Sequence, residues 1–152
     1  MNNIKIIDMH THLWEANYEK DKAEILKACD LYGIHKVYVS AMFSRNRPKE
    51  LNNPEKEAVS AMNEKVYSFK CENQEKVEGM VYVNPIHVNA LDELKRGIEE
   101  YGFKAMKLKP PVSCDSKVVY PVIEQCIRYN IPILICTWFK KTESYCQVLT
   151  PA

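Results

Sequence analysis

Glycine is scarce in this chain, with 4 in 152 residues. None lies in a glycine-rich cluster, which argues against the phosphate-cradling loop of nucleotide-binding proteins. No apolar run reaches about 18 residues, so the sequence predicts no membrane span. The N-terminus lacks the apolar stretch of a signal peptide. These absences together favour a cytoplasmic protein.

Charge of one sign is not in excess either. Lys and Arg total 21 against 20 for Asp and Glu, a net charge of +1. That balance argues against a nucleic-acid-binding surface and against a polybasic membrane anchor. Hydrophobic residues make up 46% and charged residues 27%, as in ordinary globular proteins, which excludes a disordered chain. The length predicts a single domain over residues 1–152.

The cysteines form no C-x-x-C pair. With no secretory signal they are interpreted as free thiols in a reducing compartment. Two of them fall on apolar helical stripes and are expected in the core, namely Cys29 and Cys126. Cys136 instead follows an apolar strand, where parallel α/β folds place functional groups.

Short apolar runs alternate with amphipathic stretches along the whole chain. The runs predict five strands, at residues 4–8, 36–41, 79–84, 103–108 and 131–135. The stretches between them predict four helices, at residues 21–32, from Asn53-Pro54 to 69, from Asn89 to 101, and 118–129. Strict alternation of this kind predicts a parallel sheet with right-handed crossovers.

Two architectures satisfy that alternation. One is an open, doubly wound five-stranded sheet, which the length favours. The other is an incomplete (β/α)₈ barrel, since a full barrel needs about 250 residues. The residues at the strand ends favour the barrel, with strand order 1-2-3-4-5, and we adopt it. The stretch from Phe43 to Asn53 is interpreted as a long loop at the active-site face.

The strongest chemical signal is Asp8-Met9-His10-Thr11-His12, at the end of the first strand. Residues two apart on an extended segment point to the same side. His10 and His12 are therefore expected to present two imidazoles to one ion, with Asp8 on the same face. Imidazole nitrogen is a favoured ligand of zinc and related divalent ions. The structural alternative is a pair of surface histidines in a loop.

These residues carry a resemblance to a known family. Ile7 to His12 resembles the first-strand metal motif of the amidohydrolase superfamily. Residues 102–111 (GFKAMKLKPP) resemble the fourth-strand segment of its amidohydrolase-related branch, and residues 120–124 and 131–135 are similar to the next helix and strand. The resemblance covers nearly the whole chain and implies the N-terminal part of a metal-bearing barrel that hydrolyses amides, esters or lactones, or decarboxylates acids.

The chain also departs from that family. The family usually has a metal-ligand histidine where this chain has Cys136, and often a histidine where it has Lys109. Cys136 is a candidate third ligand beside His10 and His12, or a small buried thiol at a position that has lost its ligand. The sixth-strand histidine and eighth-strand aspartate of the family have no counterpart, so the general base is unassigned.

Lys107 and Lys109 alternate with apolar residues, so both are expected to face the barrel interior. An interior lysine needs a partner, for which Asp8 is a candidate. Substrate-carboxylate binding and a structural ion pair are the favoured roles. The carboxylated, metal-bridging lysine of some superfamily branches is a further alternative, and Lys109 could instead reach solvent.

Three further residues are candidates for the mouth of a substrate pocket. Trp14 and Trp138 follow the first and fifth strands, and His87 follows the third. Ordinary packing or solvation is the alternative for each.

We therefore predict a metal-dependent hydrolase, or related decarboxylase, that acts on a small molecule with a divalent ion, zinc being the expected one. Homo-oligomerisation is a further expectation, because an incomplete barrel exposes strand edges. The rival hypothesis is a truncated or degenerate α/β protein without catalytic activity.

Overall fold

The computed structural model describes residues 4–43, 53–109 and 111–136. Its five strands are β1 (Ile6–Trp14), β2 (Ile34–Met42), β3 (Val77–Val83), β4 (Ala105–Leu108) and β5 (Ile133–Ile135). All neighbouring strands are parallel, and their order in the sheet is β1-β2-β3-β4-β5. This confirms the predicted order and excludes a doubly wound sheet, in which the strands would be reordered.

Helices connect successive strands as the alternation predicts. They are α1 (Tyr18–Tyr32), α3 (Lys56–Glu72), α4 (Ala90–Lys95) and α5 (Tyr120–Tyr129). A π-helical segment, η2 (Arg96–Glu100), continues α4, and short 3₁₀ turns precede α1 and α5, namely η1 (Glu15–Asn17) and η3 (Lys117–Val119). No helix in the described ranges is long and apolar enough to cross a membrane. Over the described residues the fold is therefore an incomplete (β/α) barrel of five strands and four helices.

Turn chemistry sets several element ends. Gly33 ends α1 with φ 64°, a left-handed conformation that glycine adopts without strain. Pro121 lies in the first turn of α5, where its missing N–H removes no helical hydrogen bond. The start predicted at Asn53-Pro54 is wrong by two or three residues, because α3 begins at Lys56 after the extended residue Glu55.

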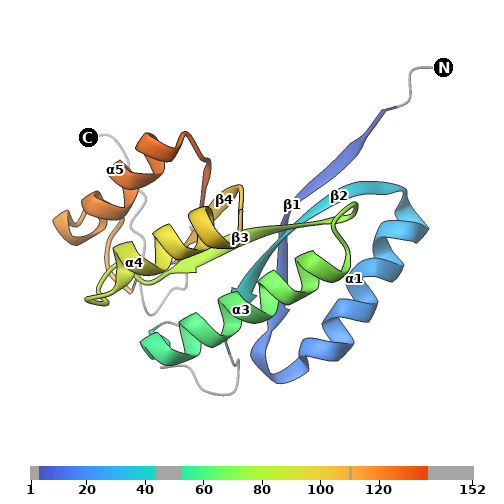
Figure 1. The fold of residues 1–152 in the computed structure, drawn as a ribbon, viewed down its shortest axis with the longest axis horizontal. Coiled ribbons are helices and arrows are strands. Elements are labelled where there is room, and N and C mark those ends of the chain that lie inside the picture. Colours follow the sequence, from blue (N-terminus) through green and yellow to red (C-terminus); the bar gives the residue numbers. More distant parts are fainter. Residues whose placement is uncertain (1–3, 44–52, 110, 137–152) are drawn as a thin grey trace, which may run out of the picture.

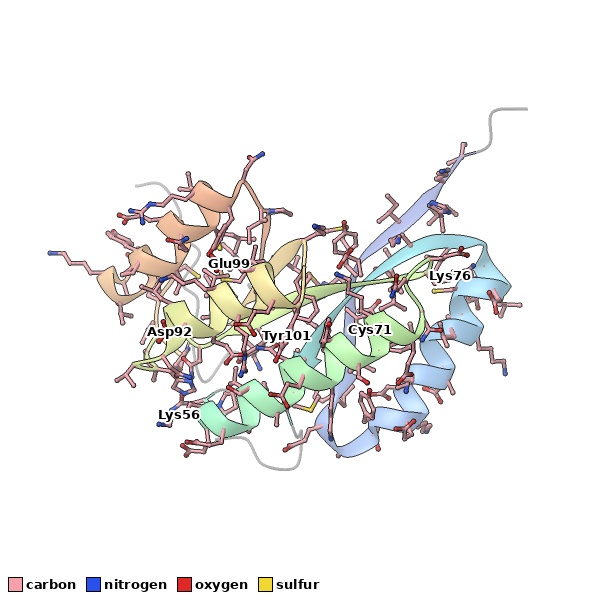
Figure 2. All side chains as sticks on the ribbon, in the orientation of Figure 1. Lys56, Cys71, Lys76, Asp92, Glu99 and Tyr101 are labelled. Atoms are coloured by element: carbon pink, nitrogen blue, oxygen red, sulfur yellow. The ribbon has the colours of Figure 1, made fainter. Side chains whose placement is uncertain are left out.

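The helices lie along one side of the strands (Figure 1). Strand residues that point to this side form the main core with α3, α4 and α5. The contact is close at Gly97, where an added Cβ would lie 2.6 Å from Val81. Figure 2 shows Tyr101 among the helices on this side, and its ring stacks on Tyr67 of α3 with centroids 4.5 Å apart. Packing therefore locks the helices to the convex side.

A buried polar network joins α3 and α4 to β3. The Glu93 carboxylate, 5% exposed, accepts hydrogen bonds from Ser60 at 2.6 Å, Asn63 at 2.8 Å and Arg96 at 2.9 and 3.0 Å. The Asn63 amide also donates to the Tyr82 carbonyl at 2.9 Å and accepts from the Tyr82 N–H at 3.0 Å. The Asn63 side chain therefore bonds both backbone groups of Tyr82.

The other side of the sheet is concave. Lys107 of β4 and His10 of β1 are separated in the sheet by β2 and β3, yet Nζ and Nε2 lie 3.3 Å apart. Only a strongly curled sheet brings these positions together, as in a barrel wall. The strands present the remaining candidate residues on this concave face.

Candidate metal and substrate site

A β-bulge shapes the end of β1. Asp8 pairs with Val37 of β2 and Thr11 pairs with Val39, so three steps on β1 match two on β2. An extra residue reverses the alternation of side chains. Asp8 therefore shares a face with Thr11, whose hydroxyl donates to Asp8 Oδ2 at 3.0 Å. The expectation that Asp8 shares a face with both imidazoles is wrong for this reason.

His10 and His12 lie beside each other beyond the bulge. Their ring centroids are 4.9 Å apart and the rings are perpendicular, at 89°. His12 Nδ1 is 2.9 Å from Ser40 Oγ on β2, a contact that orients the ring. The two imidazoles are thus on one side of the strand, as the H-x-H spacing predicts, and at the carboxyl end of the sheet.

Lys107 is the partner of His10. An ammonium can only donate, so its 3.3 Å contact with His10 Nε2 is a hydrogen bond when the histidine proton is on Nδ1. Burial lowers the pKa of His10, the Lys107 charge lowers it further, and Asp8 opposes both. The Lys107 side chain is fully buried, and burial lowers its pKa while Cys136 acts in the opposite direction. The predicted Asp8 partnership with Lys107 is replaced by this contact.

Cys136 lies just after β5, where its N–H donates to the Leu108 carbonyl at 3.0 Å. Its thiol is near enough to raise the pKa values of both Lys107 and Tyr82. Among the described residues, no three His, Cys, Asp or Glu side chains are grouped closely enough to hold a metal ion. The structure therefore pairs His10 with His12, and a three-ligand site with Cys136 stays a prediction.

Tyr82 is a residue of this site that the sequence reasoning missed. It pairs with Lys107 in the β3–β4 register, so both side chains project to the concave face. Its hydroxyl is buried with no hydrogen-bond partner in the part of the chain that the structure describes. Burial strongly raises its pKa, and Cys136 adds to the effect. The available signal was its place near the end of the third strand.

The other candidates lie around the strand ends. Trp14 ends β1, and its ring centroid is 6.4 Å from that of His12. His87 Nε2 is 3.1 Å from Asn84 Nδ2 in the loop after β3, and burial lowers its pKa. Lys109 is half-buried just after β4. Trp138 and residues 44–52 of the predicted loop lie outside the described residues.

An open cleft of about 260 Å³ lies between β1 and α1. Its lining includes Asp8, Thr11, His12 and Trp14 of β1 and Asp21 of α1. The Asp21 carboxylate accepts the Trp14 N–H at 2.8 Å. The cleft therefore reaches His12 from the side of α1, whereas Lys107 contacts His10 from the concave side.

Solved structures of larger enzymes share this fold. A protein from Staphylococcus aureus described as an amidohydrolase aligns with a TM-score of 0.67 at 15% identity, covering 87% of this chain and 47% of that one. The 5-carboxyvanillate decarboxylase from Sphingomonas paucimobilis aligns with a TM-score of 0.68 at 10% identity, covering 88% of this chain and 52% of that one. A dihydroxybenzoic acid decarboxylase from Polaromonas, solved with bound manganese and an inhibitor, aligns with a TM-score of 0.62 at 13% identity, covering 85% of this chain and 48% of that one.

These alignments confirm the predicted fold, which the chain shares with an amidohydrolase and with decarboxylases. The chain spans about half the length of the solved structures it matches. No protein-family model and no curated protein matches the sequence.

Proposed function

We propose that this chain carries the metal-binding strands of a metal-dependent enzyme of the amidohydrolase-related type. Its reaction would be hydrolysis of a C–N or C–O bond of a small molecule, or a related decarboxylation. The observation that carries the proposal is the His10–His12 pair at the carboxyl end of β1, facing a buried cation. Parallel barrels place their chemistry at this end of the strands.

The two histidines fit a divalent ion. His10 Nε2 accepts from the Lys107 ammonium, so its lone pair already faces a positive charge. In His12 the contact between Nδ1 and Ser40 Oγ is an outer hydrogen bond that fixes the ring as in known metal sites, and Nε2 is the proposed ligating nitrogen. Imidazole is a favoured ligand of zinc, and manganese is the ion bound in one of the solved structures that share the fold. Cys136 is the proposed third ligand within this chain, since a thiolate is a zinc ligand.

A bound ion would polarise a substrate carbonyl or carboxylate and lower the pKa of a bound water. The protein groups would act around it. Ser40 would hold His12 in one orientation, and Trp14 would form an apolar wall of the substrate site. Lys109 and His87, at the ends of β4 and β3, would contact the substrate. Lys107 would have to release His10 Nε2 when the ion binds, so the two cations compete for that nitrogen.

Metal affinity of the purified full chain tests this proposal. We expect His10→Ala and His12→Ala each to weaken Zn²⁺ or Mn²⁺ binding by at least about tenfold in a competition titration, since each removes a ligand. His35→Ala is the matched control, because His35 is exposed at the other end of β2. Cys136→His should increase metal occupancy. Equal affinity in all the histidine variants would contradict the site and favour a non-catalytic protein.

A further inference from the structure

The Tyr82 hydroxyl is a buried polar group on a side chain that is held in place. It is buried and lacks a hydrogen bond within the described residues. The ring is fixed against Phe43, with centroids 5.0 Å apart, and Asn63 bonds both backbone groups of Tyr82. Buried polar groups are almost always hydrogen-bonded, so such an exception in a rigid setting points to a missing ligand or water.

Lys107 is also incompletely paired among the described residues. Its side chain is fully buried, and in the described ranges its hydrogen-bond partner is one histidine nitrogen, with no carboxylate at ion-pair distance. An ammonium has three donors and carries a charge that is costly to bury without a counter-ion. Lys70 shows the usual solution: it binds Glu78 at 2.9 Å and two backbone carbonyls.

These two incompletely paired side chains lie on neighbouring strands. Tyr82 and Lys107 are register partners of β3 and β4, and such residues have backbones about 4.8 Å apart with side chains on the same face. Cys136, just after β5, is the residue whose charge acts on the pKa of both side chains, in agreement with their place on one face in the β3–β4 register. Together they offer a neutral donor and a cationic donor, with the apolar Phe43 ring beside them.

We propose that the Tyr82 hydroxyl and the Lys107 ammonium form a binding pair for the carboxylate of a small organic acid. Two donors match the two oxygens of a carboxylate, and one positive charge balances a monoanion rather than a phosphate dianion. The proposal rests on the proposed function, because it names a substrate or product feature for the same concave face. It places the carboxylate beside His10, which Lys107 contacts. Both donors are fully buried, so ligand entry requires local opening of the strand ends.

Calorimetric titration of the full chain with acetate and benzoate, after treatment with a chelator, tests the pair. We expect saturable binding of at least one carboxylate and none of the neutral analogue benzamide. Tyr82→Phe should weaken carboxylate binding about tenfold, as loss of a hydrogen bond to a charged group does. Lys107→Met should weaken it by more than Tyr82→Phe, because the charge is lost as well.

Matched controls are Tyr38→Phe, at the middle of β2, and Lys104→Met, exposed before β4. Both should bind the carboxylate as the parent chain does. Binding that is absent from the parent chain, equal for benzamide, or unchanged in Tyr82→Phe would overturn the proposal. The chelator makes this result independent of metal, whereas the metal titration of His10→Ala is performed without carboxylate, so either proposal can fail alone.

Discussion

Glu93, between α3 and α4, and Lys107, on the concave face, are both buried charged side chains, but their surroundings differ. Glu93 accepts hydrogen bonds from three side chains, one of them the arginine that balances its charge. Lys107 has a neutral imidazole as its partner and no carboxylate nearby among the described residues. A satisfied network stabilises a fold, whereas an unsatisfied cluster lowers stability and is retained where a ligand completes it.

The difference assigns roles to the two faces of the sheet. On the convex face, hydrogen bonds from Asn63 fix β3 against the helices. On the concave face, His10, Tyr82 and Lys107 are positioned but incompletely paired. Variants that remove one group from each face should therefore change stability in opposite directions.

The largest effect is expected at Glu93. Glu93→Ala leaves Arg96 and the Asn63 amide without their acceptor, and removing one partner of a buried pair should lower the free energy of unfolding by about 3 kcal/mol. Urea unfolding measures this change. The matched control is Glu64→Ala, which removes an exposed carboxylate 3.8 Å from the same Arg96 and should alter stability by less than about 0.5 kcal/mol. Equal effects would show that the network is not stabilising.

The buried Lys107 and the partly buried Lys70 give a sharper test. Lys70→Met breaks an ion pair and two hydrogen bonds to carbonyls, so we expect a loss of about 2 kcal/mol. Lys107→Met removes an uncompensated charge and should leave stability unchanged or raise it by about 1 kcal/mol. Chemical unfolding of both variants in one buffer compares them. A loss of stability in Lys107→Met as large as that in Lys70→Met would contradict the different roles assigned to the two faces of the sheet.

Tyr82→Phe should act in the same direction as Lys107→Met, but less strongly. It deletes a hydroxyl that is buried and, within the described part of the chain, has no hydrogen-bond partner, so the midpoint of thermal unfolding should rise, with a gain of about 1 kcal/mol in the absence of ligand. Tyr18→Phe is the control, because that hydroxyl donates to the Lys65 carbonyl at 3.0 Å. A lower unfolding midpoint for Tyr82→Phe would indicate that its hydroxyl has a structural role.

The smallest effect concerns pH. Burial and Lys107 lower the pKa of His10 below 6.5, its value in the unfolded chain. The folded state therefore resists protonation, and the stability contributed by neutral His10 is complete above about pH 6.5 and is lost as pH falls through the lowered pKa. Unfolding midpoints measured from about pH 7.5 down to 5 should decline less in His10→Gln. His87, which shifts in the same direction, contributes equally to both proteins, so an unchanged decline would contradict the assignment to His10.

Local patterns in the sequence were sufficient for most of the fold. The alternation of apolar runs and amphipathic stretches predicts five strands, four helices and a parallel sheet, because side-chain periodicity is set by each element's own geometry. The H-x-H spacing places His10 and His12 together for the same reason, and the alternation around Lys107 predicts its inward direction. These inferences depend on neighbours in the sequence.

Contacts between distant segments decided the rest. The bulge in β1 arises from its pairing with β2, and it places the Asp8 side chain on the face opposite the two imidazole rings. The curl of the whole sheet brings Lys107 to His10, 97 residues away. The unpaired hydroxyl of Tyr82 depends on what surrounds it after Phe43 and Asn63 have packed. The sequence alone determined which residue types stand at the strand ends, but only tertiary packing decided which of them meet and which are left unsatisfied.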